Sequence, residues 1–128
     1  MQLQASTYYA VSILVHLFKH PGDKVRNIAE AVGITLPLAT RIILRLRQDG
    51  YIVNIPNRRG CYTLGKPASE IRFYDVFVAT EGELCISHCF DKGTQYEDGT
   101  HSKTHVLFQT IQDNLMEDML SASIADLV

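Results

Sequence analysis

The stretch that most constrains the fold of this 128-residue chain is residues 25–50, VRNIAEAVGITLPLATRIILRLRQDG. Apolar side chains recur there at positions i, i+3, i+4 and i+7, which predicts a helix over about residues 24–32 with one buried face. Gly33 ends this helix, because glycine reverses the chain at little steric cost. The apolar positions are Val25, Ile28, Ala29 and Val32.

A second helix is predicted immediately after Gly33. Thr35 is a suitable N-cap, and Pro37 is tolerated in the first turn because the N–H groups there have no helical partner. One side of this helix is apolar, and the opposite side carries cations and no acid. The apolar side holds Leu38, Ala39, Ile42, Ile43 and Leu46, and the opposite side holds Pro37, Thr40, Arg41, Leu44, Arg47 and Gln48, with Arg45 at the boundary.

Two helices joined by a tight glycine turn form the helix-turn-helix pattern, whose second helix enters the major groove of DNA. Ala29, four residues before Gly33, permits the close approach of the two helices. Many helical pairs carry a glycine turn, so an ordinary helical hairpin with a solvated basic face is the alternative interpretation.

A β-hairpin is predicted directly after the two helices. Residues 51–55 alternate as in a short strand, residues 56–60 (PNRRG) are turn residues, and residues 61–64 return as a second strand. A hairpin in this place is a wing, and Arg58 and Arg59 at its tip are well placed for a phosphate or a narrow minor groove. The combination of helix pair and wing favours DNA binding over an ordinary helical hairpin with a solvated basic face.

Two further long helices are predicted, one over residues 1–19 and one over residues 104–122. The second carries two apolar stripes, so we expect it to pack both on its own domain and on a second partner. A twin helix from a second subunit is the economical choice, and a core helix in a monomer is the alternative. The stripes are Phe108, Ile111, Leu115 and Met119 on one line and Leu107, Met116 and Leu120 on the other.

The charge of the chain is divided unevenly. The net charge is −2, yet residues 1–72 hold ten Lys and Arg against four acids, and residues 73–128 hold two Lys against ten acids. The basic first half can bind phosphate, whereas the acidic second half is expected to have a different role.

The length and composition predict one mainly α-helical compact unit with a small β-hairpin wing, divided into a winged helix-turn-helix (residues 1–82) and a sensor loop with a dimerisation helix (residues 83–128). No apolar run reaches the roughly 18 residues of a membrane helix. The start lacks a secretion signal and the chain has three cysteines, an odd count. We therefore expect a cytoplasmic protein with no membrane partner and no disulfide framework.

The whole chain resembles the bacterial Rrf2 family, the IscR/NsrR-type winged-helix transcription factors. MQLQASTYYAVSILVHL is similar to the family's first helix, and IAEAVGITLPLATRIILRLRQDGYI is similar to its helix-turn-helix. RRGCYTLGKPASEI resembles the wing, DVFVATEG the helix after it, and SIADLV the closing residues. The resemblance implies a homodimeric DNA-binding regulator, usually a repressor, which acts on a palindromic operator.

Matching positions imply the DNA-contacting residues. Those at or near the major groove are Thr35, Pro37, Leu38, Thr40, Arg41 and Arg45, and those of the wing are Arg58, Arg59 and Tyr62. The chain departs from the family at Gly60 and Cys61, which replace part of a glycine-rich wing turn.

A larger departure concerns the sensor. Cluster-binding members carry three cysteines between the helix after the wing and the dimer helix, and Cys89 falls where the first belongs. The other two are missing from a region that holds Gln95, Tyr96 and Ser102. A cluster held by three thiolates is therefore not available at those positions.

A different ligand set is present in the same region. Cys85, Cys89, His101 and His105 read C-x3-C-x11-H-x3-H, which is close to zinc-finger spacing. This spacing favours a zinc site or an atypical iron–sulfur cluster with mixed ligands. The alternatives are a redox-sensing thiol at Cys89, an unknown effector, or no effector at all. The sequence alone assigns no cofactor to this ligand set.

Other function classes are weighed against DNA binding. A winged-helix protein-interaction module that never touches DNA is the second hypothesis, since the overall charge is negative. An enzyme is not expected, because the sequence shows no glycine-rich phosphate loop, no nucleophile–base pair at a recognisable spacing and no paired carboxylates in an apolar setting.

Overall fold

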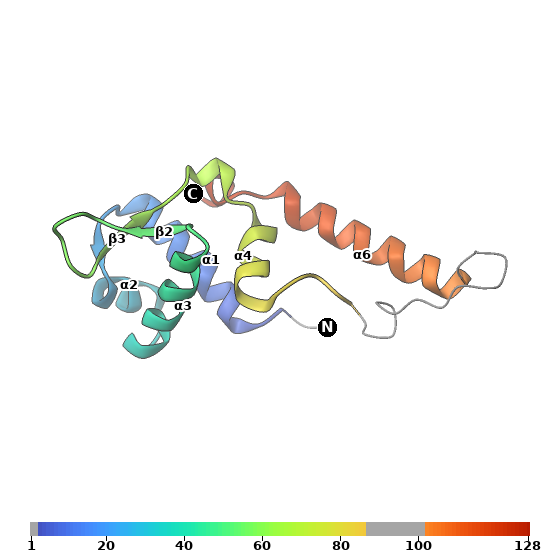
Figure 1. The fold of residues 1–128 in the computed structure, drawn as a ribbon, viewed down its shortest axis with the longest axis horizontal. Helices are drawn as coiled ribbons and strands as arrows, with labels where there is room; N and C mark the ends of the chain where they lie inside the picture. The colour runs from blue at the N-terminus through green and yellow to red at the C-terminus, as the bar shows by residue number, and fades with distance from the viewer. Residues whose placement is uncertain (1–2, 87–101) are drawn as a thin grey trace.

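The computed structural model describes residues 3–86 and 102–128. In this part of the chain, five α-helices surround a small antiparallel sheet, and the last helix projects from the body (Figure 1). The predicted architecture, a mainly helical winged helix-turn-helix followed by a long C-terminal helix, is confirmed. The elements are α1 (Ala5–Lys19), β1 (Asp23–Lys24), α2 (Val25–Val32), α3 (Leu36–Gln48), β2 (Ile52–Asn54), β3 (Cys61–Leu64), η1 (Ala68–Glu70), α4 (Phe73–Glu81), α6 (Lys103–Ser121) and η2 (Ile124–Leu127).

Helix α1 is the centre of the main core. It begins at Ala5 rather than at the predicted residue 1, because Gln4 is already extended. It packs against α2, α3, α4, β3 and η2. The fully buried side chains on this face are Ala10, Ile13, Leu14 and Leu17.

The turn between α2 and α3 forms as predicted. Gly33 adopts a left-handed conformation with φ of 81°, and its N–H donates to the carbonyl of Ala29 at 2.9 Å. The side chain of Thr35 accepts a hydrogen bond from the N–H of Leu38 at 3.4 Å, so Thr35 caps α3. The chain bends by 109° between the two helices. No single helix in the described ranges is long and apolar enough to cross a membrane.

The sheet contains one strand more than predicted. Its order is β1-β3-β2, so the two residues of β1 extend the expected hairpin on the side of β3. Asp23 pairs with Tyr62, and the N–H of Gly22 donates to the carbonyl of Tyr62 at 2.8 Å. This pairing fixes the base of the wing to the segment that enters α2.

Asp23 also connects β1 to α1. Its Oδ2 forms a hydrogen bond with Nε2 of His16 at 2.7 Å, and its Oδ1 accepts from the side chain of Asn27 at 2.8 Å and from the N–H of Lys24 at 2.9 Å. Burial alone would raise the pKa of Asp23, but the hydrogen bonds from these three partners outweigh it and lower the pKa below its ordinary value of 3.8.

The end of the chain returns to the body. The N–H of Phe73 donates to the carbonyl of Ala122, and the N–H of Ile124 donates to the carbonyl of Ile71, each at 2.9 Å. Ile124 is buried in the main core. Residues 122–128 therefore pack on the winged-helix body, although the predicted boundary at residue 82 groups them with the C-terminal unit.

The last helix packs against α4 through a small second cluster. Phe77 of α4, Leu84 and Met119 of α6 form its buried part, and Leu115 and Met116 pack against it. The predicted start and end of this helix are each within one residue of those observed. The two predicted stripes are thus not separate faces, because each contributes residues to the α4 contact.

The backbone of Gly50 passes very close to Gly65. The N–H of Gly65 donates to the carbonyl of Tyr51 at 2.9 Å, and a Cβ added at Gly65 would overlap the carbonyl oxygen of Gly50. We expect Gly65→Ala to lower the free energy of unfolding by roughly 1–3 kcal/mol, as overpacking does. Urea unfolding measures this, and Ser69→Ala on the exposed η1 surface is the control. If Gly65→Ala and Ser69→Ala have the same free energy of unfolding, the carbonyl of Gly50 does not approach Gly65 this closely.

The hydrogen-bonded carboxyl group of Asp23 should make the stability of the protein depend on pH. A carboxyl group whose pKa is lowered by folding stabilises the protein above its unfolded pKa, and this contribution is lost as the pH falls through the folded pKa. The stability difference between wild type and Asp23→Asn should therefore be present at neutral pH and shrink below about pH 4. Asn27→Ala removes one of the three donors and should show an intermediate dependence. Denaturant unfolding from pH 7 to pH 3 tests this, and a constant difference across that range would refute it.

Candidate nucleic-acid interface

Helix α3 presents a cationic outer face as the sequence predicts. Its inner side chains are buried, whereas Pro37, Arg41 and Arg47 are exposed. Thr40 is half-buried, and its hydroxyl donates to the carbonyl of Leu36 at 2.9 Å. The outer face therefore combines exposed guanidinium groups with a short polar side chain, which suits a groove of DNA. The buried inner residues are Ala39, Ile42, Ile43 and Leu46.

Leu38 differs from the other predicted groove residues. It is half-buried and packs against the main core, as its place on the apolar side of α3 indicates. Leu36 and Leu44 are instead exposed, at 41% and 45% of their surface. The outward apolar positions of α3 are therefore Leu36 and Leu44.

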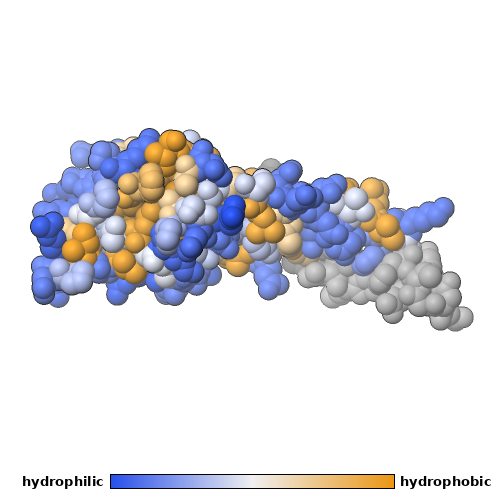
Figure 2. Space-filling view, turned by 90° about the horizontal axis from the view of Figure 1, so that it is seen from above, coloured by the Kyte–Doolittle hydropathy of each residue, from blue (hydrophilic) through white to orange (hydrophobic). Residues whose placement is uncertain are grey.

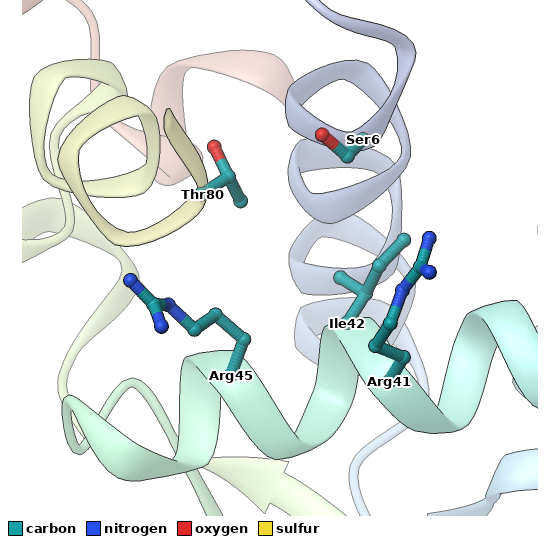
Figure 3. Close-up of a pocket in the computed structure, with 5 residues that line it drawn as sticks. All are labelled: Ser6, Arg41, Ile42, Arg45 and Thr80. Carbon is teal, nitrogen blue, oxygen red and sulfur yellow. The ribbon is translucent and has the colours of Figure 1, made fainter. Parts of the chain in front are cut away.

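Arg45 is exposed, like Arg41, and one of its nitrogens is bonded to the protein itself. Its Nε donates to the carbonyl oxygen of Ala79, in the last turn of α4, at 2.5 Å. Figure 3 shows the Arg45 guanidinium turned toward α4, whereas Arg41, one helical turn earlier, extends beside α1. This bond connects α3 to α4 and explains why Arg45 lies at the boundary between the two faces.

The tip of the wing is a compact turn with exposed arginines. Asn57 has φ of 64°, and the N–H of Arg58 donates to the carbonyl of Ile55 at 3.2 Å. Arg58 and Arg59 are exposed beyond this turn, as predicted. Tyr62 is half-buried in β3 and packs against the main core, so only part of its side chain is accessible.

The structure also shows cationic residues that the sequence reasoning did not single out. A cavity of about 520 Å³ lies between the start of α2 and the wing, and it is lined by Lys24, Arg26, Asn27 and Arg59. Helix α2 has no side-chain cap and no acid in its first turn. Its N–H groups thus favour an anion such as a phosphate. The available signal was the pair of cations, Lys24 and Arg26, at this helix start, although the carboxylate of Asp23 lies beside them and bonds to Asn27.

The chain matches known proteins along its length. Residues 3–128 match the Rrf2 family, described as an iron-dependent transcriptional regulator. The HTH-type transcriptional regulator IscR of Photorhabdus laumondii is 29% identical over 132 residues, which covers 100% of this chain and 79% of the relative. The structure of IscR from T. potens has a TM-score of 0.77 at 21% identity, covering 99% of this chain and 85% of that one.

A second solved structure supports the same fold. CymR of B. subtilis, the global cysteine regulator, has a TM-score of 0.76 at 18% identity, covering 99% of this chain and 95% of that one. At these identities the structural likeness establishes the fold.

The family description names iron, and the described residues do not form a site for it. Of the predicted metal ligands, Cys85 and His105 lie in the described part, and Cys89 and His101 lie outside it. Among residues 3–86 and 102–128, no three His, Cys, Asp or Glu side chains converge as metal ligands would. The N–H of His105 donates to the hydroxyl of Ser102, which caps α6. A zinc or iron–sulfur site stays a prediction.

The helix-turn-helix geometry, the wing and the match over residues 3–128 agree with one another. The relatives are transcriptional regulators and not enzymes. This chain belongs to the Rrf2 family of winged-helix, DNA-binding transcriptional regulators.

Proposed function

We propose that this regulator acts in the cytoplasm as a homodimer, binds a short palindromic operator and represses transcription there. The observation that carries the proposal is the presence of exposed basic side chains both on the outer face of α3 and around the cavity between α2 and the wing. Repression is the simplest output, because a dimer that covers an operator keeps polymerase from it.

The residues of the interface have separate roles in this proposal. Arg41 reads base edges in the major groove, since it is exposed on α3 and a guanidinium can bond two acceptors of one guanine. Thr35, Pro37 and Thr40 line the same edge of α3. Arg45 and Leu38 hold α3 in place, the first through Ala79 and the second through the core.

The wing and the start of α2 bind the backbone in the same proposal. Arg58 and Arg59 are exposed at the wing tip, and Arg59 shares the 520 Å³ cavity with Lys24 and Arg26. A phosphate there would meet side-chain cations and the N–H groups of α2 together. Tyr62 supports this part of the wing from within β3.

The homodimer is proposed through α6. The end of this helix near the body packs on α4, but its other half extends beyond α4 (Figure 1), and Figure 2 shows apolar side chains along the projecting helix. Exposed apolar side chains on a projecting helix favour an interaction site. A second copy of α6 is the occupant we propose, because two copies would place two α3 helices on one dyad. The exposed apolar residues of α6 are Val106, Leu107, Ile111 and Leu120.

The arginine variants test the DNA interface. Arg41→Ala should relax discrimination between sequences, with a loss of about 1–3 kcal/mol at the best site and little loss on random DNA. Arg58→Ala or Arg59→Ala should weaken binding to all sequences and reduce the salt slope by about 1. Selection of sites from a random duplex pool, followed by binding titrations at several salt concentrations, measures both effects.

Lys103→Ala is the matched control for these variants, because it removes one cation at the start of α6. It should bind DNA as the wild type does. If Arg41→Ala and Arg58→Ala also bind as the wild type, both role assignments are wrong. If the wild type binds no duplex at low salt, the chain is an interaction module that does not touch DNA.

A charge introduced on the exposed apolar side of α6 tests the dimer. Ile111→Glu places a carboxylate on the exposed apolar face and should convert the dimer to a monomer at micromolar concentration, because an unpaired charge is costly to bury. Ser69→Glu is the control, since it adds the same charge at an exposed position of η1, outside α6. Sedimentation equilibrium gives the mass of each. A wild-type monomer, or an Ile111→Glu dimer, would rule out this interface.

A further inference from the structure

A second cavity lies behind the outer face of α3, at the junction of three helices. It has a volume of about 380 Å³ and is lined by Ser6 of α1, Thr80 of α4, and Arg41, Ile42 and Arg45 of α3. Figure 3 shows the three α3 side chains along one side and Ser6 and Thr80 across from them. The roles proposed for DNA binding leave this space unexplained.

The chemistry of the lining is selective. The Arg45 and Arg41 side chains lie at its two ends, the Ser6 hydroxyl lies across from them, and the Ile42 side chain supplies an apolar wall. The Thr80 hydroxyl is engaged with the carbonyl of Val76 at 2.9 Å and with the hydroxyl of Thr7. No acid lines the cavity in the described part of the chain. Two guanidinium groups and the hydroxyl of Ser6 match an oxyanion, and the apolar wall matches a short carbon skeleton.

The Arg45 side chain is held in position by a hydrogen bond to the backbone. Nε of Arg45 is fixed on the carbonyl of Ala79, so its two terminal nitrogens have a defined direction. The hydroxyl oxygen of Thr80 lies 2.7 Å from that of Thr7, which is buried and also donates to the carboxylate of Glu81. This contact ties the first turn of α1 to the last turn of α4, and it engages the acid nearest to the cavity. A site with fixed donors loses less free energy on ligand binding than a flexible one.

We propose that this cavity binds a small organic oxyanion, with a carboxylate or phosphate group between Arg41 and Arg45, and that the bound anion regulates DNA affinity. The anion would neutralise Arg41 and join α3 to α1 and α4. The regulatory half of this proposal rests on the function proposed above, because it assumes that Arg41 meets DNA. The binding half does not depend on DNA.

Binding is tested on the whole chain without DNA. Malonate, inorganic phosphate and neutral malonamide are titrated at constant ionic strength, and the methyl signals of Ile42 and Thr80 are followed by NMR. Saturable shifts with malonate or with phosphate support the site and identify the preferred head group, while malonamide should produce none. The absence of saturable shifts with either anion overturns the proposal.

Variants separate the cavity from general charge effects. Ser6→Met fills the cavity and Arg45→Gln removes one guanidinium, and each should weaken anion binding by at least about tenfold. Ser12→Met lies on another face of α1, and Arg47→Gln removes an exposed guanidinium from α3, so both should stay within about twofold of wild type. Ser6→Ala removes only the hydroxyl and covers the case in which Ser6→Met does not fold. Equal weakening by Arg45→Gln and Arg47→Gln would show diffuse charge attraction and overturn the site.

Regulation is tested with a duplex at low salt. The anion should lower the DNA affinity of the wild type, and Ser6→Met should bind DNA normally and lose the response to the anion. An anion that binds without changing DNA affinity overturns the regulatory half and leaves the site. Failure of the protein to bind DNA even without the anion contradicts the proposed function, and the NMR result still decides the cavity.

Discussion

The position of every functional element depends on the burial of one face of α1. Ile13, Leu14 and Leu17 are fully inaccessible to solvent, and burial of each such side chain stabilises the fold by about 1.5–3 kcal/mol. The same helix carries His16, which bonds to Asp23 of β1, and Thr7, which bonds to Glu81 of α4. The apolar face therefore provides the stabilising free energy, and the polar groups at the two ends set the direction of β1 and α4.

The parts of the fold that follow local rules could be predicted from the sequence. Gly33 ends α2 because it takes a left-handed conformation, and Thr35 begins α3 because its hydroxyl caps the first turn. The 3.6-residue period assigned the buried side of α3 correctly. Strand β1 could not be predicted, since two residues show no period and Asp23 becomes a strand only through its pairing with Tyr62.

The candidate site was predicted less completely, because side-chain direction depends on packing between distant segments. Arg41 and Arg45 are chemically identical and lie one turn apart, yet Arg45 meets the carbonyl of Ala79 across 34 residues of sequence. The family resemblance implies that both lie at or near the groove, and the sequence carries no sign that Arg45 also bonds to α4. The cluster at the start of α2 has the same origin, since Arg59 joins Lys24 and Arg26 only when the wing folds back beside α2.

Helix α4 joins the two ends of the molecule that the proposed function needs. On one side, Phe77 of α4 packs with Met119 of α6, beside the surface proposed for the dimer. On another side, Ala79 accepts from Arg45 of α3, and Thr80 borders the cavity that contains Arg41. The helix is only nine residues long, and the Asp75 carboxylate caps its start by accepting from the N–H of Arg72 at 2.9 Å. Helix α4 therefore contacts α6 and bonds directly to α3, so the proposed dimer surface and the proposed anion site both adjoin the same short helix.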